Sequence, residues 1–588
     1  MNFIRNRKFR AGPQTSLEGF ICPQSSGKQQ KNRVFGRSEG GGNGSGENES
    51  GVSYASFSIN LPTTNGTRAT DPSFDKGDAK EYDVFNATLL VFKKGTTAGE
   101  GNYTLAEKVD LGSMEPWKDP SETGVTTQAK ITAKLENVNK NDDFFALVLL
   151  NNGSGADAKV TLPSEGNKFS DWNVAAKATD KFTDTKKGFY MANAPLYNAT
   201  DKSVTTLVPI KKENIYSTEA QASSGDAAAD IYVERGLAKV TLTDATKDEK
   251  TVGTSSSYAG DKVKISNWAL DVTNKKTFPI HNVEGLKDDF DAIWNNEAAT
   301  EASGPSTQRF VDNNGSTKAK RVYWGKDPNY SEMNLSAATE ESKTAREEHF
   351  TYVKKENLTA APTDPLYCLE NTFNLANMVQ GQTTRVIFKA SYTPNGFTET
   401  DGKTFYKVGT SVALWSQKNL EAHIKTAVTK VISGATTDNT TIDLTAEGNN
   451  ITTAGNHEIK ASNITVAGHD VTPEEVKAVN AKVGLTEKAG ISTYANGESY
   501  YIARIKHFGD ALTPWNSGVY GNDNLAYLGR YGMLRNNWYD LDVQSVSGPG
   551  YPDVPEVKPS TPDDEDDKYI KVSVKILDWA KRSQSVDL

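Results

Sequence analysis

The residue types that perform chemistry are sparse in this sequence, and none of them stands in a catalytic spacing. The nucleophile pattern GxSxG, the zinc pattern HExxH, the phosphate-binding P-loop and the redox pair CxxC are all absent. His457 and Glu458 are followed by Ile, Lys and Ala, so the second histidine of a zinc site is missing. Cys368 lies in an apolar-flanked strand segment, where a cysteine usually packs as a small hydrophobic side chain. We therefore expect no catalytic residue, no metal and no cofactor.

Carboxylates are numerous, but they favour solvated surfaces over catalytic pairs. Asp142 and Asp143 are adjacent, and Asp563–Asp567 is a continuous acidic run of the kind that usually stays in solvent. Asp312–Gly315 begins like a calcium loop but lacks the rest of the EF-hand pattern. A β-sandwich glycan hydrolase would need two acids that converge in a cleft, which a sequence does not show. An enzymatic function is therefore the weaker alternative.

Length and composition indicate a multidomain, β-rich protein. A chain of 588 residues with 36% hydrophobic residues is too long for one core and suggests roughly two to four domains. Its 47 glycines and abundant Thr, Asn and Ser are typical of secreted β-proteins with many turns. The net charge of −9 argues against nucleic acid as a partner. No apolar run approaches the length of about 18 residues that a membrane-spanning helix needs.

The first 50 residues predict a disordered leader or linker. Met1–Arg10 is basic, but no apolar stretch follows, so a signal peptide is not recognisable. Ser38–Ser50 is mostly Gly, Ser, Asn and Glu, the composition of a flexible linker. Cys22 is a candidate for lipidation, although the residues before it do not form a lipobox.

A strand with one buried face is expected shortly after this leader. Its apolar residues Ala55, Phe57, Ile59 and Leu61 alternate with Ser, Ser and Asn. Pro62 ends the strand, and the polar turn that follows carries Arg68 just before Ala69. A basic residue in a small polar loop is readily cut by an arginine-specific protease. The alternative is that Arg68 is an ordinary surface residue.

A second strand of the same kind ends the chain. Ile570, Val572, Val574 and Ile576 alternate with Lys, Ser and Lys, the pattern of a half-buried strand rich in β-branched residues. Trp579 follows it and either anchors the end of the strand or caps a core locally.

The segment before this strand is rich in proline. Gly548–Pro562 holds five prolines, which hinder sheet pairing and favour an extended chain of about 3.1 Å per residue, roughly 45 Å in all. The acidic run Asp563–Asp567 follows it. This order predicts a stiff spacer that carries an undocked strand away from its own domain. The alternative is that the strand folds back as an edge of its own sheet.

The middle of the chain reads as strands separated by turns, as in β-sandwiches with long loops. Two short helices are expected, Gln417–Ile432 from its amphipathic pattern and another that begins at the N-cap Thr472. Thr251–Gly260 is the expected domain boundary. The clearest predicted strands are Val84–Phe92, Lys130–Leu135, Asp143–Leu150, Val204–Ile210, Ile231–Leu242, Val263–Val272, Arg321–Trp324, Thr384–Tyr392, Phe405–Ser411, Tyr500–Ile505 and Trp538–Val546.

Several strings in this region resemble a known family when they are taken in order. They are IYVERGLAKV (231–240), NWALDVTNKKTFPIHNV (267–283), YCLENTF (367–373), TTRVIFKA (383–390), YLGRYGMLRNNWYDLDVQSVSGPG (527–550) and ILDWAKRSQSVDL (576–588). Together they resemble the major shaft subunit of the Bacteroidales minor (short) fimbria, a type V pilin of the fimbrillin family. The resemblance runs from about Val52 to the C-terminus.

The resemblance implies a lipoprotein precursor with two transthyretin-like, Greek-key β-sandwich domains in tandem and an extended C-terminal donor strand. In that family an arginine-specific protease removes the first strand, and the C-terminal strand of a neighbouring subunit fills the groove. By resemblance, Arg68–Ala69 is the cleavage point, Ala55–Leu61 the removed strand and Lys568–Trp579 the donor strand. The family's hydrophobic signal and lipobox are not recognisable in this sequence.

The expected division of the chain follows from this resemblance. The segments are 1–50 (leader), 51–68 (removed strand), 69–255 and 256–547 (the two β-sandwich domains) and 548–588 (linker and donor strand). We expect a fimbrium on the outer membrane that supports adhesion and biofilm formation. Its partners would be copies of itself, anchor and tip subunits, the maturation protease and surface ligands. The alternative is a monomeric surface lipoprotein or tip adhesin that binds glycan or host protein.

Overall fold

The fold is built almost wholly from β-strands, which confirms the all-β class predicted from the sequence. The structure is a computed structural model, and every residue that it describes lies in one compact unit, Ser45–Leu588. The described residues are 51–60, 81, 83–112, 128–177, 182, 187–198, 203–284, 320–331, 337, 339–508, 513, 528–561 and 570–578. None of the helices among them is long and apolar enough to cross a membrane.

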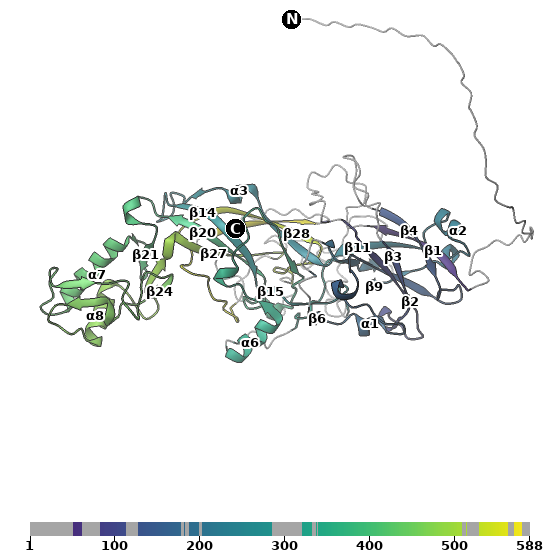
Figure 1. Ribbon diagram of the computed structural model, residues 1–588, viewed down its shortest axis with the longest axis horizontal. Coiled ribbons are helices and arrows are strands. Elements are labelled where there is room, and N and C mark those ends of the chain that lie inside the picture. Colours follow the sequence, from purple (N-terminus) through teal and green to yellow (C-terminus); the bar gives the residue numbers. More distant parts are fainter. Residues whose placement is uncertain are drawn as a thin grey trace, which may run out of the picture. The chain divides into compact units, whose positions relative to one another are not determined.

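The N-terminal part forms one large mixed sheet, the first sheet (Figure 1). Its strands lie in the order β3-β2-β5-β7-β11-β1-β4, and β10 pairs with β5. Their bounds are β1 Ser53–Asn60, β2 Ala87–Lys93, β3 Thr104–Gly112, β4 Gln128–Leu135, β5 Phe144–Leu150, β7 Met191–Asn193, β10 Val208–Pro209 and β11 Ala229–Arg235.

The first sheet encloses the first hydrophobic core. β5 reads FFALVLL, a nearly continuous apolar run of the kind expected for a strand buried on both faces. Phe57 and Ile59 of β1 and Ile231 and Val233 of β11 are fully buried in the same core. Aromatic rings close it, among them Phe92 against Phe169 with centroids 5.6 Å apart. The core therefore depends on β1 as much as on the strands that follow.

Two further sheets of the described region enclose the second core. One has the order β19-β12-β28-β29, with β12 Leu237–Leu242, β19 Leu366–Leu369, β28 Asn537–Val546 and β29 Ile570–Asp578. The other has the order β13-β14-β20-β27, with β13 Lys250–Thr251, β14 Lys262–Asp271, β20 Arg385–Thr393 and β27 Glu498–Arg504.

A single glycine connects the two cores. Gly236 lies between β11 in the first sheet and β12 in the second core. A Cβ at this position would approach the rings of Phe182 and Tyr190 to 3.0 Å, so a larger residue would displace them. The prediction of one strand over Ile231–Leu242 was therefore wrong, because the chain changes sheets at Gly236. The change of core comes upstream of Thr251–Gly260, and the division into domains remains a prediction.

An inserted α/β unit between β21 and β26 has its own core of aliphatic side chains. Helices α7 Gln417–Val431 and α8 Pro473–Val483 pack against each other there, and Figure 1 shows them side by side. Both agree with the sequence prediction, and Thr472 caps α8 in a capping box with Glu475. The sheet next to them has the order β22-β21-β26-β24, with β21 Phe405–Val408, β22 Leu414–Trp415, β24 Gly455–His457 and β26 Ile491–Tyr494.

The remaining elements of the described region are short. The other helices are α1 Phe169–Trp172, α2 Glu219–Ser224, α3 Asp244–Lys247 and α6 Glu340–His349. Small two- and three-stranded sheets contain β6 Ala176–Lys177, β8 Leu196–Asn198, β9 Ser203–Thr205, β15 Thr273–Asn274, β16 Lys276–Thr277, β17 Lys320–Arg321, β18 Phe350–Thr351, β23 Thr440–Ile442 and β25 Ile464–Val466. Of the predicted strand Arg321–Trp324, only Arg321 lies in β17.

Candidate assembly site

β1 lies between two neighbours in the first sheet. It pairs in parallel with β11, where Phe57 lies opposite Ala229, and antiparallel with β4 along all eight residues, where Ser56 lies opposite Thr132. Loss of β1 would leave β11 and β4 two strand spacings apart, about 9.5 Å, which is room for one strand. We call the space that β1 occupies the β1 slot.

Both faces of β1 are buried, whereas the sequence pattern predicted only one. Ala55, Phe57 and Ile59 point into the first core and have no exposed surface, as expected. On the other face Ser56 is also fully buried and Ser58 is 8% exposed. Helix α2 packs against β1, and Figure 1 shows it beside the strand. The prediction of a solvent-facing side was therefore wrong, because a helix distant in sequence covers it.

β4 is held in place by groups other than β1. Glu107 of β3 accepts hydrogen bonds from the backbone N–H groups of Glu136 (2.8 Å) and Asn137 (3.0 Å), just beyond the end of β4. Lys130 donates to the backbone carbonyls of Ser223 (3.0 Å) and Gly225 at the end of α2. Burial raises the pKa of Glu107, and the two backbone hydrogen bonds oppose this shift. The outer wall of the β1 slot is thus tied to β3 and α2.

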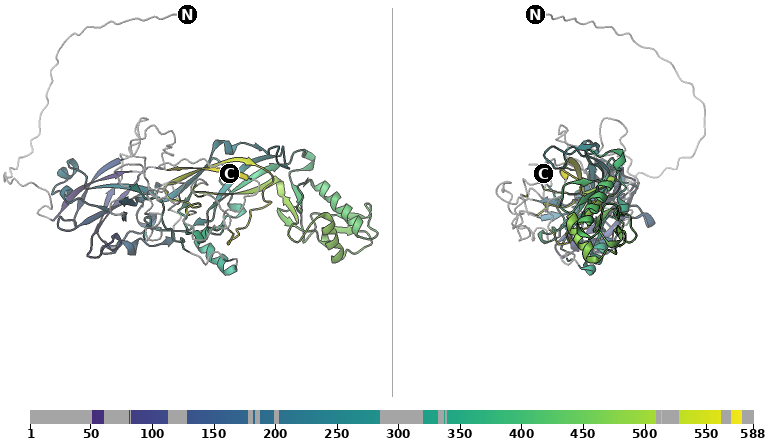
Figure 2. Two further views of the ribbon diagram at one scale, coloured as in Figure 1. Left: turned by 180° about the vertical axis from the view of Figure 1, so that it is seen from behind. Right: turned by 90° about the vertical axis from the view of Figure 1, so that its left-hand side faces the viewer.

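The C-terminal strand is docked in its own sheet. β29 pairs antiparallel with β28 along its length, so that Val574 lies opposite Leu541 and Ile576 opposite Tyr539. In the figures, β29 is the yellow strand next to β28 (Figure 2). It is the last strand of its sheet in the described region and has β28 as its one strand neighbour there. The prediction of an undocked strand was therefore wrong, and the alternative of an edge strand in its own sheet is the correct one here.

The proline-rich segment is also docked, which contradicts the prediction of a spacer leaving its domain. We call Gly548–Thr561 the strap. The Tyr501 and Tyr494 hydroxyls donate to the carbonyls of Gly548 (3.0 Å) and Gly550 (2.8 Å), and Tyr551 pairs with Tyr500 through two backbone hydrogen bonds. Further along, Arg385 donates to Pro555 O (2.8 Å) and Gln380 N–H to Thr561 O (2.9 Å).

Proline removes a backbone donor but leaves its carbonyl free to accept, and residues of β20, β26 and β27 supply donors to the strap. The strap is therefore held by its carbonyls and not by sheet pairing alone.

Several predicted site residues lie outside the described part of the chain. They are Cys22, Leu61, Arg68, Ala69 and Trp579, together with the acidic segments Asp312–Gly315 and Asp563–Asp567. Ile570, Val572, Val574 and Ile576 are placed by their backbone pairing in β29.

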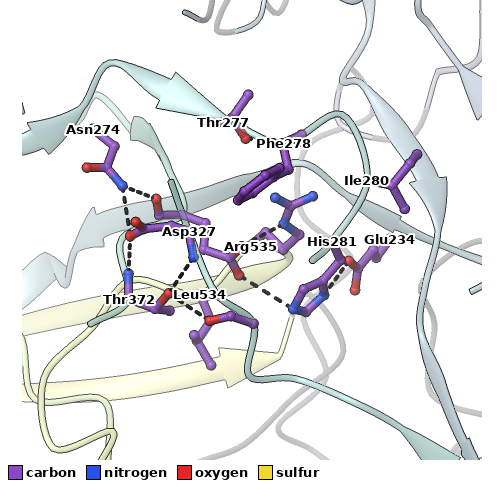
Figure 3. Close-up of polar contacts among 12 residues, drawn as sticks. Glu234, Asn274, Thr277, Phe278, Ile280, His281, Asp327, Thr372, Leu534 and Arg535 are labelled. Carbon is purple, nitrogen blue, oxygen red and sulfur yellow. Dashed lines mark hydrogen bonds and ion pairs between the residues drawn. The ribbon is translucent and has the colours of Figure 1, made fainter. Parts of the chain in front are cut away.

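A buried polar cluster joins several loops near the first and second cores (Figure 3). His281 Nδ1 lies 2.8 Å from Glu234 Oε1, and His281 Nε2 lies 3.8 Å from Glu370, which also pairs with Arg535 at 3.1 Å. A Cβ on Gly325 would lie 2.1 Å from the His281 ring, so only glycine fits above it. These groups come from separate segments of the chain and contact one another in a closed interior.

Asp327 belongs to the same cluster. Its carboxylate accepts hydrogen bonds from Asn274 Nδ2 (2.9 Å) and from the backbone N–H groups of Asn329 and Thr372, both at 2.5 Å. Burial raises the pKa of Asp327 to about 7, and the hydrogen bonds oppose this shift.

The other candidate chemical groups are inert in their settings. Cys368 is a free, buried thiol whose pKa is raised to about 12 by burial, so it is not a nucleophile at neutral pH. His457 Nε2 donates to Thr453 O (2.8 Å), which is the one side-chain hydrogen bond of His457 among the described residues. No group of three His, Cys, Asp or Glu side chains that could hold a metal ion occurs among the described residues.

The strap, β27, β28 and β29 all lie within the part of the chain that matches a known family. Residues 492–585 match the family described as the major fimbrial subunit protein type IV, fimbrillin, C-terminal. Over these residues the chain is similar to the fimbrillin family. The match supports a fimbrial structural or adhesion subunit.

No curated protein matches the sequence. Two crystal structures of Parabacteroides distasonis proteins assigned to cell adhesion are similar over 90% of this chain, each with 11% identity. The first has a TM-score of 0.37 and is covered over 98% of its length, and the second has a TM-score of 0.32 and is covered over 99%. At these TM-scores we infer neither fold nor function from them.

Sequence reasoning found the two strands of the assembly site but missed the groups around them. The burial of Ser56 and Ser58 left no signal in the local alternation of residues. Glu107, α2 and the carbonyl anchors of the strap left no such signal in the sequence either.

Proposed function

We propose that the protein is the shaft subunit of a surface fimbria and polymerises by donor-strand exchange after proteolysis at Arg68. The observation that supports this most directly is the difference between the two terminal strands. β1 is paired on both edges within the first sheet, and β29 is paired with β28 on one edge in the described region. A strand that moves from the edge of one sheet into the β1 slot of another copy exchanges one strand neighbour for two.

Strand exchange is favoured because the donor strand gains a second strand neighbour. Removal of β1 would expose apolar surface of the first core together with unpaired backbone groups of β11 and β4. A strand from another copy covers both, which is the β-augmentation mode of binding. Each backbone hydrogen bond contributes about 0.5–1.5 kcal/mol net, so pairing on a second edge favours the exchanged state.

The polarity of this contact favours a filament. Because donor strand and β1 slot are different parts of the surface, the contact is heterologous and repeats from copy to copy. The partners that follow from the proposal are other copies of the chain, anchor and tip subunits and an arginine-specific protease of the outer membrane. Adhesion to host or bacterial surfaces and biofilm formation belong to the same proposal. A monomeric surface lipoprotein or tip adhesin is the alternative, and the presence of a complete donor strand disfavours it.

The deciding experiment is electron microscopy of purified protein before and after treatment with an arginine-specific protease. We expect filaments only after cleavage, and a ladder of species resistant to mild detergent on electrophoresis. Arg68→Ala and the charge-conserving Arg68→Lys should both stay monomeric and folded. Monomers that remain monomers after complete cleavage at Arg68 would contradict the proposal.

A further inference from the structure

The β1 slot has a size restriction on the side that faces away from the core. At the centre of that side Ser56 is fully buried, and α2, with Ala222 also fully buried, packs over it. Of the positions on either side, Tyr54 is partly exposed and Ser58 is buried with 8% of its surface exposed, so Ser56 is the most enclosed of the three. Any strand that replaces β1 must therefore place a small residue at the position of Ser56.

The donor strand has one residue that meets this restriction. Its sequence Ile570–Ile576 reads IKVSVKI, in which Ser573 is the small residue among two lysines on the polar side. The sequence is also symmetric about Ser573, so the same requirement holds whichever way the strand runs. A lysine at the position of Ser56 would place an ammonium group in a closed space where the Ser56 hydroxyl itself has no hydrogen-bond partner among the described residues, which is strongly unfavourable.

We propose that Ser573 of the donor takes the place of Ser56 in the slot of the next copy and thereby fixes the register of the fibre contact. This inference rests on the proposed function. With the donor running as β1 does, Ile570, Val572, Val574 and Ile576 take the places of Ser53, Ala55, Phe57 and Ile59. All four of these positions are fully buried, and Ile570 is larger than the Ser53 that it replaces, so the chain at Val138, whose carbonyl accepts a hydrogen bond from Ser53 (3.0 Å), must move to admit it.

The charged residues next to Ser573 affect how favourable this register is, but they do not exclude it. Lys575 would take the place of Ser58, which lies opposite Lys130 on β4 and opposite Asp230 on β11. Like charges on paired strands repel weakly, and the carboxylate of Asp230 is available on the other neighbour. A shift of two residues would put Lys571 or Lys575 at the fully buried position of Ser56, opposite Thr132 on β4, without the carboxylate that Asp230 supplies opposite Ser58.

Disulfide trapping tests the register directly. Thr132 lies opposite Ser56 on β4, and directly opposed residues have Cβ atoms about 4.5–5.5 Å apart, close enough for a disulfide after a small adjustment. We expect cleaved protein with the pair T132C and S573C to form disulfide-linked oligomers under oxidation. The pairs T132C with K571C and T132C with K575C are the off-register controls and should give at least about tenfold less cross-linking. Of the native cysteines, Cys368 is buried and Cys22 precedes the cut.

Substitutions at the same position give a second measurement. Ser573→Lys should lower the yield of polymer at least about tenfold because it places a charge at the buried position. Ser573→Ala should polymerise like the wild type, and Lys571→Ser is a matched control for change of charge in the same strand. If the wild type does not polymerise after cleavage, the proposed function fails. If it polymerises but cross-links through position 571 or 575, or tolerates Ser573→Lys, only the register is overturned.

Discussion

Asp327 is a buried carboxyl group whose titration should be visible in the stability of the protein. Its pKa of about 7 in the folded chain lies above its ordinary value of 3.8 because burial disfavours the charged form. Between pH 4 and pH 7 the unfolded chain releases this proton and the folded chain keeps it. The free energy of unfolding should therefore fall by about 1.4 kcal/mol per pH unit over this window and level off above it.

The measurement is urea unfolding of the wild type and Asp327→Asn at pH 5, 6, 7 and 8. The variant cannot titrate, so the difference in stability between the two proteins should change across this range. Asp244→Asn is the control, because Asp244 is exposed and Lys247 holds its pKa below the ordinary value. A difference that is constant from pH 5 to pH 8 would mean that Asp327 is ionised in the folded protein throughout.

Glu107 should matter more after β1 has been removed than before. In the uncut protein β4 is held by β1 along eight residues as well as by the Glu107 carboxylate. We expect Glu107→Ala to lower the stability of the uncut protein by roughly 1–3 kcal/mol, because two backbone N–H groups lose their acceptor. After cleavage the same variant should form much less polymer, since the wall of the slot is then poorly held.

Glu136→Gln is the matched control for this prediction. Its side chain pairs only with the exposed Lys134 among the contacts of the described residues, and its backbone N–H still donates to Glu107. Polymer yield and thermal unfolding of all three proteins are measured before and after cleavage. Equal loss of polymer in both variants would show that the carboxylate of Glu107 has no particular part in holding β4.

At the residue scale the sequence predicts the burial of a side chain well where that burial follows from the local pattern of apolar and polar residues. Ala55, Phe57 and Ile59 are buried because alternation places them on the core side, and Cys368 is buried because apolar residues flank it. The buried Ser56 was not predictable in the same way, since its cover is a helix more than about 160 residues later in the chain. Long-range ion pairs such as His281 with Glu234 leave no periodic signal for the same reason.

The strap is the element whose behaviour differs most from the expectation for a proline-rich segment. A Cβ on Gly550 would lie 2.1 Å from Tyr500 O, so Gly550→Ala should force the strap away from β27. We expect a loss of stability of about 1–3 kcal/mol and faster hydrogen exchange and proteolysis over residues 548–561. Gly253→Ala is the control, because a Cβ there has no atom within 4 Å. A strap as protected in Gly550→Ala as in the wild type would contradict its tight docking.

Elements were predictable from pattern, but their partners were not. Period-two alternation located β1, β14, β20, β28 and β29, and amphipathic and capping signals located α7 and α8. Period-two alternation does not indicate which sheet a strand joins. It therefore predicted one strand over Ile231–Leu242, where Gly236 separates β11 from β12. It also did not show that β29 pairs with β28, or that tyrosine and arginine side chains donate to carbonyls of the strap such as Gly550 O and Pro555 O.

For the whole molecule, a docked strap limits how far the donor strand can move. If Thr561 remains hydrogen-bonded to Gln380, only the residues after it can leave with β29. The eight residues 562–569 span at most about 26–29 Å when fully extended. The donor would therefore reach the next copy on a short tether, and successive copies of the fibre would lie close together.

A head-to-tail fibre built on this contact should have two chemically different ends, and each end should be blocked by a different variant. A chain that stops at Thr561 lacks β29 and can accept a strand after cleavage but cannot donate one. An Arg68→Ala chain keeps β1 and can donate but cannot accept. Each variant, mixed at a low ratio with cleaved wild type, should shorten the filaments in proportion to its share, as measured by electron microscopy. Mixed only with each other, the two should form dimers and nothing longer, because the head-to-tail contact can then form once. Filaments of unchanged length in either mixture would show that the contact between copies does not use these two strands.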